Sequence, residues 1–315
     1  MNEPARILLV FLDGVGIGEA DPEVNPFARA CARGQIPTLH RLMGGRLPTL
    51  ATPRVRGPGG GTFPLDATLD VEGTPQSGTG QAALLTGLNA AEMLGRHFGP
   101  WTPVRLRPLV EQRSLLRRAA DAGRSVAFAN AYPRGWPGAN GGRRVAGPPL
   151  AARGAGLLDR HEEALATGDA VSSEIVNDGW RRHLGHVGLP RVSAAAAGAN
   201  LAGIAARHEL TLYAHYTTDS AGHDRSMAPA VGALRRVDAF LGGLTAALRP
   251  DTLLLVASDH GNLEDVRVGH TRNPALGIAW GPGAEAAAEL GDIRDVTPFV
   301  LRLLGVRPGG ASLAG

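Results

Sequence analysis

The hydrophobic positions of the chain follow two alternating patterns. Five short runs are apolar almost throughout, as buried strands are, and the stretches between them repeat apolar residues with a helical period. Strands that are apolar on both faces and alternate with helices are typical of a mostly parallel sheet sandwiched between helices. We therefore predict an α/β fold with strands in 6–13, 125–132, 210–219, 251–260 and 275–283, and helices in 108–122, 194–208, 228–248 and 295–304.

One segment in the middle of the chain departs from this alternation. Residues 133–144, PRGWPGANGGRR, are rich in glycine and proline, and a polar helical stretch follows at about 158–185. We predict that residues 133–190 form a small cap inserted into a core made of residues 1–132 and 191–315, with approximate boundaries. A long surface excursion of the core is the alternative.

Composition narrows the class of protein. The 315 residues are 43% hydrophobic, which is ample for a buried core. All 32 basic residues are arginines, the net charge is only +3, and no basic run has the length that a nucleic-acid surface needs. Cys31 is the single cysteine, and neither a secretion signal nor an apolar run of membrane length occurs. We expect a cytoplasmic protein without nucleic-acid or membrane partners; the oligomeric state leaves no trace in the sequence.

Acids and histidines gather at the ends of the predicted strands. Asp13 ends one strand in LDGVG, Asp219 another in YTTDSAGH, and Asp259 a third in ASDHGN. Ligands of parallel sheets bind beyond the carboxyl ends of the strands. A mixed set of carboxylates and imidazoles suits Zn²⁺ or Mn²⁺ better than a metal that prefers thiolates. The sequence therefore predicts metal ligation by Asp13, Asp219, His223, Asp259, His260 and His270.

Each of these residues alone also has an ordinary structural explanation. An Asp after a strand, such as Asp13, is often a helix cap or a turn residue, and a lone histidine such as His270 often lies at the surface or in a hydrogen-bonded core. Two observations favour the metal site. Only small residues separate Asp219 from His223, which we expect to let both side chains reach one ion, and all the motifs coincide with strand ends.

A glycine-rich loop, TPQSGTGQAALLTG at 74–87, opens into an apolar helix and carries Ser77 and Thr79. At a helix N-terminus the free backbone N–H groups and the helix dipole favour a phosphate oxygen, so Ser77 is the candidate nucleophile. Thr79 is close enough to be an alternative attacking hydroxyl. The ordinary explanation is a serine that caps the helix, and the loop lacks the Gly-Lys-Ser/Thr ending of a Walker loop.

Taken in order, these motifs resemble those of the alkaline phosphatase superfamily, in the metalloenzyme branch that holds cofactor-independent phosphoglycerate mutase and phosphopentomutase. LDGVG, IPTLHRL, the SGTG loop, DSAGH, DHGN and HTRNP all match, and the closing DIRDVTPFVLRLLGV is similar. The resemblance implies an alkaline phosphatase-like core that holds two divalent ions, Mn or Zn. It assigns one ion to Asp219, His223 and His270. It assigns the other to Asp13, Ser77, Asp259 and His260.

The chain also departs from this branch. Gln81 stands where the branch usually has a histidine, and the segment between the serine loop and DSAGH is too short for the large transferase domain of the phosphoglycerate mutase. It is nearer in size to a reduced phosphopentomutase cap. Lysine is absent, so arginine must bind the substrate phosphate if that role is filled. The candidates in the cap are Arg134, Arg143 and Arg144.

The resemblance implies two-metal phosphoryl transfer to or from a small phosphorylated metabolite, through a phosphoserine at Ser77. A mutase must exclude water and return the phosphoryl group, which demands a closing cap. The small cap favours a phosphatase and the motifs favour a phosphomutase, so both stay open. A phosphodiesterase or another hydrolase of the superfamily is the next alternative. A non-catalytic descendant that keeps the metals is a further one, although none of the six acids and histidines is missing.

Overall fold

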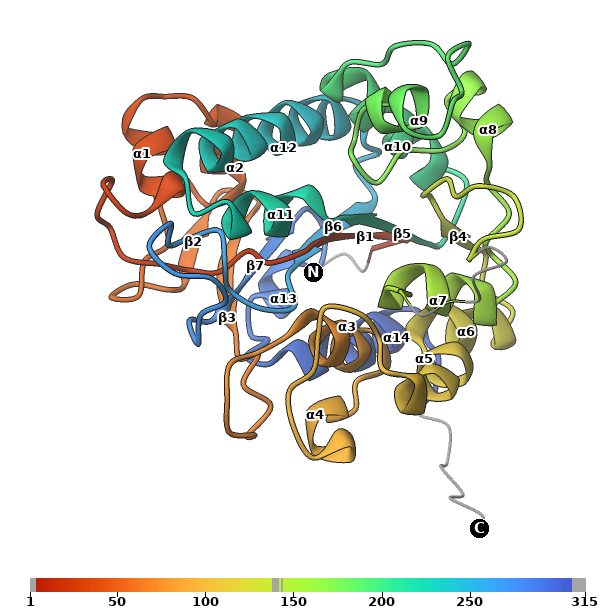
Figure 1. Cartoon of the computed structure of the whole chain (residues 1–315), viewed down its shortest axis with the longest axis horizontal. Coiled ribbons are helices and arrows are strands. Elements are labelled where there is room, and N and C mark those ends of the chain that lie inside the picture. The colour runs from red at the N-terminus through yellow and green to blue at the C-terminus, as the bar shows by residue number, and fades with distance from the viewer. Residues whose placement is uncertain (1–3, 138–141, 143, 308–315) are drawn as a thin grey trace.

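The computed structural model describes residues 4–137, 142 and 144–307. Its strands are β1 (Arg6–Leu12), β2 (Val55–Gly57), β3 (Gly60–Leu65), β4 (Val126–Phe128), β5 (Leu210–His215), β6 (Thr252–Ala257) and β7 (Ala275–Trp280). They form a seven-stranded sheet in the order β2-β3-β7-β6-β1-β5-β4 (Figure 1). β1 pairs in parallel with β5 and β6, and β5 with β4, whereas β7 runs antiparallel to β6 and β3, and β3 to β2. All strands except β2 and β7 therefore point the same way.

The strands at the centre of the sheet are covered on both faces. Every residue of β5 and β6 is buried, and β1 is buried except at its first residue. A strand without a solvent face has no reason to alternate, and β1 reads RILLVFL. The α/β class and the mostly parallel sheet between helices are confirmed, and each of the five predicted runs contains a strand.

Two features of the sheet differ from the prediction. β2 and β3 form a hairpin that pairs with β7, and no strand was predicted there because glycine and proline interrupt the apolar pattern of that segment. In addition, residues 216–219 do not extend β5. Asp219 lies in a short helix, α11 (Thr217–His223), four residues beyond the end of β5.

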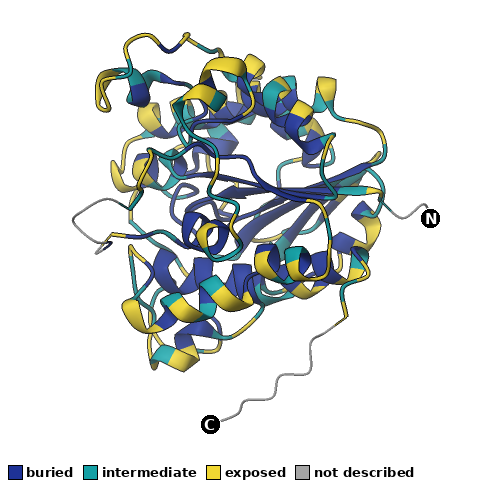
Figure 2. Ribbon diagram, turned by 90° about the vertical axis from the view of Figure 1, so that its right-hand side faces the viewer, coloured by how far each residue is buried: buried dark blue, intermediate teal, exposed yellow. Residues whose placement is uncertain are grey.

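Helices form one layer on each face of the sheet (Figure 1). Figure 2 shows the buried strands between the two layers. One layer consists of α1 (Pro26–Ala32), α2 (Pro37–Leu42), α10 (Ala194–Ala205) and α12 (Met227–Ala247). The other consists of α3 (Ser77–Thr86), α4 (Ala90–Leu94), η1 (Val104–Leu106), α5 (Arg107–Arg113), α6 (Leu115–Asp121), α7 (Gly147–Gly154), α13 (Ala284–Ala287), η2 (Ile293–Asp295) and α14 (Val296–Leu303).

The predicted helices are present as α10, α12 and α14, with one exception. The stretch predicted at 108–122 is divided into α5 and α6, because Ser114 has an extended backbone and its hydroxyl accepts a hydrogen bond from the Arg117 N–H as the cap of α6. Among the described residues, no helix is both long enough and apolar enough to cross a membrane.

The segment predicted to be a cap makes two kinds of contact. Its first helix, α7, packs against α3 and α5, and Leu150 is buried in the same apolar cluster as those helices. The later part holds α8 (Glu162–Thr167) and α9 (Asp178–Arg182), where Leu165 and Trp180 belong to a small separate apolar cluster. By these contacts α7 belongs with the main core. The division of the chain into core and cap stays a prediction.

Candidate metal centre

The ends of three neighbouring parallel strands bring the predicted ligands together. Asp13 directly follows β1, and Asp259 and His260 follow β6 after one serine. Asp219 and His223 stand one helical turn apart in α11, so both side chains lie on one face of that helix. The ligand atoms form two sets, each within 4.8 Å: an open group of Asp219, His223 and His270, and a buried group of Asp13, Asp259 and His260.

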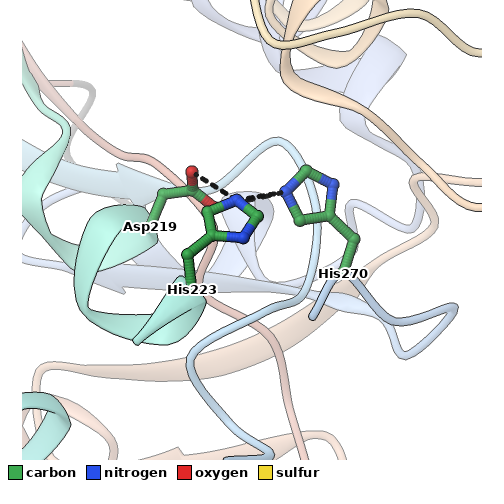
Figure 3. Close-up of side chains that lie close together, drawn as sticks. All are labelled: Asp219, His223 and His270. Atoms are coloured by element: carbon green, nitrogen blue, oxygen red, sulfur yellow. Dashed lines mark hydrogen bonds and ion pairs between the residues drawn. The ribbon is translucent and has the colours of Figure 1, made fainter. Parts of the chain in front are cut away.

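The open group places two imidazoles against one carboxylate (Figure 3). Nε2 of His223 lies 3.3 Å from Oδ2 of Asp219, and Nε2 of His270 lies 3.4 Å from Oδ1. Nδ1 of His270 lies 3.0 Å from the carbonyl oxygen of Pro75, so Nδ1 is the donor and Nε2 presents its lone pair. The two Nε2 atoms face each other at 3.1 Å. This geometry suits ligands that converge on one cation.

The buried group lies beside the hydroxyl of Ser77. Oγ of Ser77 is 2.9 Å from Nε2 of His260 and 3.5 Å from Oδ1 of Asp13. The same His260 nitrogen is 3.4 Å from Oδ1 of Asp13 and 3.7 Å from Oδ2 of Asp259. All four side chains are buried. A hydroxyl, an imidazole nitrogen and two carboxylates therefore face a common point.

The electrostatics of the buried group favour a cation. Burial raises the pKa of Asp13 and of Asp259, and the charge of Asp13 raises the latter further. Burial opposes a proton on His260, but the charge of Asp259 and the hydrogen bond with Asp13 outweigh it and raise the His260 pKa to about 10. Oδ2 of Asp259 is buried without a hydrogen-bond partner. A proton on His260 compensates part of the negative charge of the two buried carboxylates, and a dication would compensate all of it. The donor set therefore fits a metal ion.

The carboxylate of the open group has a different balance. Burial acts to raise the pKa of Asp219, but the hydrogen bond with His270 and the charge of His260 outweigh it and lower that pKa to about 2. The amide of Asn262 donates to Oδ1 of Asp219 at 2.6 Å. The fold therefore holds Asp219 ionised and oriented, which is the state that a metal ligand requires.

Two glycines make room for α11 at this site. Gly14 has φ +67°, and a Cβ there would lie 2.4 Å from Oδ1 of Asp219. A Cβ on Gly222 would lie 2.6 Å from the side chain of Asn262. The small residues between Asp219 and His223 were expected to let both side chains reach one ion. These residues form one helical turn of α11, and Gly222 lets Asn262 approach.

Ser77 is the first residue of α3, and its hydroxyl points into the buried group. Gly80 allows this turn to lie against the loop that follows β6, because a Cβ there would come within 2.8 Å of the carbonyl oxygen of Asp259. The hydroxyl of Thr79 is engaged elsewhere: it accepts from the Phe98 N–H at 3.2 Å and donates to a backbone carbonyl oxygen at 3.2 Å. The geometry favours Ser77 over Thr79 as the attacking hydroxyl.

Gln81 fills a role that the sequence analysis did not assign. Its Nε2 donates to Oδ2 of Asp13 at 3.0 Å, and its Oε1 accepts from the Gly147 N–H at the start of α7 at 2.9 Å. Gln81 thus fixes one oxygen of Asp13 and leaves the other facing Ser77. No local pattern could reveal this link, since the two partners of Gln81 are brought to it only by the tertiary fold.

Two further polar residues were missed in the loop after β6. The amide of Asn262 holds Asp219, and the carboxylate of Glu264 accepts hydrogen bonds from the loops that flank both groups. Asn262 directly follows the DHG motif, and Glu264 comes two residues later. Their proximity to that motif was the one signal available.

Arg134, one of the predicted substrate arginines, pairs with acids of its own segment. The guanidinium of Arg134 is 2.7 Å from Glu163 and 3.6 Å from Glu162, at the surface. Arg144 is exposed. Arg143 lies outside the described residues. The contacts described for Arg134 and Arg144 do not include the six acids and histidines.

Fold and site together define an α/β protein with two acid and imidazole groups at the carboxyl edge of its sheet. The profile of the Metalloenzyme superfamily matches residues 190–308. The 2,3-bisphosphoglycerate-independent phosphoglycerate mutase 2 of Methanosarcina acetivorans is 35% identical over 97 residues, which cover 28% of this chain and 19% of that protein. A phosphopentomutase of Methylobacterium sp. is 45% identical over 64 residues, covering 20% and 16%. The chain thus aligns with about a fifth of the length of these curated relatives.

Solved structures extend the likeness of fold to nearly the whole chain. The PH0037 protein from Pyrococcus horikoshii has a TM-score of 0.59 and 13% identity, with 99% of this chain and 100% of that chain covered. The alkaline phosphatase from the Antarctic bacterium TAB5 has a TM-score of 0.57 and 11% identity, with 98% and 100% covered. Residues 190–308 thus match the metalloenzyme superfamily, the chain has an alkaline phosphatase-like fold, and its homology to the two mutases is distant.

Proposed function

We propose that this protein is a metal-dependent phosphoryl-transfer enzyme, a phosphatase or a phosphomutase, that acts on a small phosphorylated metabolite through a phosphoserine at Ser77. One observation carries the proposal: a buried hydroxyl, Ser77 Oγ, lies 2.9 Å from Nε2 of His260 within a cluster of carboxylates and imidazoles. The family and the aligned relatives, which are named as phosphoglycerate mutases and a phosphopentomutase, support it.

The buried group with Ser77 would hold one divalent ion and the open group the other, as Mn or Zn. Two divalent cations bound there would stabilise the attacking and leaving oxygens of an in-line phosphoryl displacement. Asn262 and Gln81 orient one carboxylate in each group, so that little rearrangement is needed when charge develops.

Ser77 supplies the attacking oxygen. Its Oγ forms a bond to phosphorus while the ester P–O bond breaks, water takes the hydroxyl proton, and the leaving oxygen takes a proton from water. Ser77 begins the ten-residue helix α3, whose dipole favours the negative phosphoryl group at this end. The product is a phosphoserine. In a phosphatase, water hydrolyses it; in a phosphomutase, an oxygen of the bound dephosphorylated intermediate attacks its phosphorus, and the bond to Ser77 Oγ breaks.

Exposure bears on the choice between these two outcomes. The side chain of His223 is 54% exposed, whereas that of His260 is fully buried. Water can therefore approach from the side of the open group, which favours hydrolysis, unless the inserted segment closes over a bound substrate. The likeness to named mutases favours isomerisation. Released phosphate would indicate a phosphatase, and isomerised product would indicate a phosphomutase.

Arg225 is a candidate for binding the substrate phosphate. It lies two residues beyond His223 with φ +47°, a left-handed conformation that glycine usually takes at a helix end. Its Nη2 would lie 3.6 Å from a Cβ on Gly269, the residue before His270. Arg225 is exposed and makes no ion pair with any residue that the structure describes. Its position beside the open group makes it a stronger candidate than Arg134.

The proposal is tested with purified protein loaded with Mn²⁺ or Zn²⁺, with its metal content measured. A panel of sugar phosphates, phosphoglycerates and an aryl phosphate is assayed for released phosphate and for isomerised product, and the protein is analysed for phosphoserine by mass spectrometry. Ser77→Ala should abolish turnover and the phosphopeptide while both ions stay bound, and Thr79→Val should retain turnover. Absence of both products from the metal-loaded wild type would contradict the proposal.

A non-catalytic metal-binding descendant would also retain both ions but would show neither product nor phosphoserine. A phosphodiesterase would cleave an aryl phosphodiester faster than the corresponding monoester, and this pair of substrates belongs in the panel.

A further inference from the structure

Glu264 is a buried carboxylate that the proposed chemistry does not use. It is 1% exposed and accepts four hydrogen bonds, all from uncharged donors. Oε2 accepts from the backbone N–H groups of Gly16 at 3.0 Å and Asn262 at 2.8 Å. Oε1 accepts from the Thr271 hydroxyl at 2.5 Å and the Asn273 amide at 3.1 Å. Among the residues that the structure describes, no arginine or histidine pairs with it.

These four donors come from the loops that carry the predicted metal ligands. Gly16 lies three residues after Asp13, Asn262 two residues after His260, and Thr271 directly after His270. Asn262 in turn holds Asp219 through its side chain. One carboxylate therefore joins the loops of both metal groups.

The backbone around Glu264 leaves room for this one side chain. A Cβ on Gly16 would lie 2.4 Å from the carboxyl carbon of Glu264, and a Cβ on Gly261 would lie 2.4 Å from its Oε1. Four donors aimed at one group require an acceptor with two oxygens, which an ionised carboxylate provides and a glutamine amide does not. Burying a charge without a cationic partner is costly unless hydrogen bonds and a nearby cation compensate.

We propose that Glu264 is a positioning residue of the metal centre. It holds the His270 loop through Thr271 and Asn273 and the His260 loop through Asn262, so that both imidazoles meet their ions in one orientation. Its negative charge also adds to the field that attracts the cations. This inference rests on the proposed function for the presence of the two ions, and it makes a prediction about metal affinity that does not depend on turnover.

The test compares Glu264→Gln with Asp238→Asn, a matched buried carboxylate that is remote from the centre and accepts from the Leu39 N–H at 2.7 Å. Mn²⁺ binding to each metal-stripped protein is titrated by calorimetry, with far-UV circular dichroism to verify the fold. Loss of a group that orients metal ligands through hydrogen bonds weakens metal binding by about 10- to 100-fold. We expect a loss of that size in Glu264→Gln and unchanged affinity in Asp238→Asn.

A second pair of variants tests the same contact if Glu264→Gln does not fold. Thr271→Val removes one donor to Glu264 and should weaken the binding of one ion, whereas Thr271→Ser keeps the hydroxyl and should retain it. Wild-type affinity in Glu264→Gln or Thr271→Val would overturn the inference and leave the proposed function standing. Two ions bound by the wild type without turnover would contradict the proposed function and leave this inference standing. A wild type that binds no ion would overturn both.

Discussion

Neutralising two acids of the metal centre should change the stability of the metal-free protein in opposite directions. The pKa of Asp219 is lowered to about 2 from an ordinary value of 3.8, so the fold favours its ionised form. That contribution is complete above pH 4 and is lost only as the pH falls through about 2. At about 1.4 kcal/mol per pKa unit, Asp219→Asn should cost about 2 kcal/mol at pH 7.5.

The ionised carboxylate of Asp259 has the opposite effect on the stability of the metal-free protein. Its pKa is raised well above the ordinary value by burial and by the charge of Asp13, and its Oδ2 has no hydrogen-bond partner. Asp259→Asn removes a buried charge and keeps an oxygen to accept from the Gly14 N–H. The amide group that replaces Oδ2 carries no charge, and burying an unpaired charge costs more than burying an uncharged polar group, so the metal-free variant should gain about 1–3 kcal/mol of stability.

Urea unfolding of chelator-treated protein, followed by circular dichroism at pH 7.5, measures both changes. The same variants should lose the stabilisation that metal gives the wild type, about 2.7 kcal/mol at a concentration one hundred times the Kd. A metal-free Asp259→Asn protein that is less stable than the wild type would refute the reasoning. That result would mean that the Asp259 carboxylate stabilises the metal-free fold through its own contacts, whereas we infer that it destabilises this fold and is kept because it binds a metal ion.

Two other substitutions test parts of the same site, and a thiol probe tests the burial of Cys31 in α1. Gln81→Leu leaves an oxygen of Asp13 and the first N–H of α7 buried without partners, so urea unfolding should show a loss of about 2–4 kcal/mol. Gly14→Ala combines φ +67° with a Cβ 2.4 Å from Asp219, and calorimetry should show weaker metal binding together with a stability loss of at least about 1 kcal/mol. Burial raises the pKa of Cys31 from 9.0 to about 11, so its reaction with a disulfide reagent at pH 8 should be roughly 100-fold slower than in the urea-unfolded chain. Equal rates in the two states would show that the thiol is not shielded.

The sequence was informative where one physical pattern governed a whole element. β1, β5 and β6 are covered on both faces, so their sequences are mostly apolar and polar residues follow them closely. Those ends coincide with Asp13 and Asp259, and the structure brings both beside His260 and Ser77.

Other features depended on tertiary contacts that no local pattern encodes. The hairpin of β2 and β3 is rich in glycine and exists because it pairs with β7. Asp219 was placed at a strand end, but α11 begins at Thr217, since the apolar run of β5 gives no signal for its last residue. Gln81 donates a hydrogen bond to Asp13, 68 positions away, and Glu264 accepts one from Gly16, 248 positions away. Their roles therefore become visible only in the folded chain.

Anomalous diffraction from crystals grown with Mn²⁺ and with Zn²⁺ tests the central claim most directly. Two peaks are expected, one within about 2.0–2.3 Å of the ligand atoms of the buried group and one at the same range from those of the open group. The first peak should lie beside Oγ of Ser77. An ordered structure at saturating metal without a peak at either group, or with ions bound only elsewhere, would contradict the account.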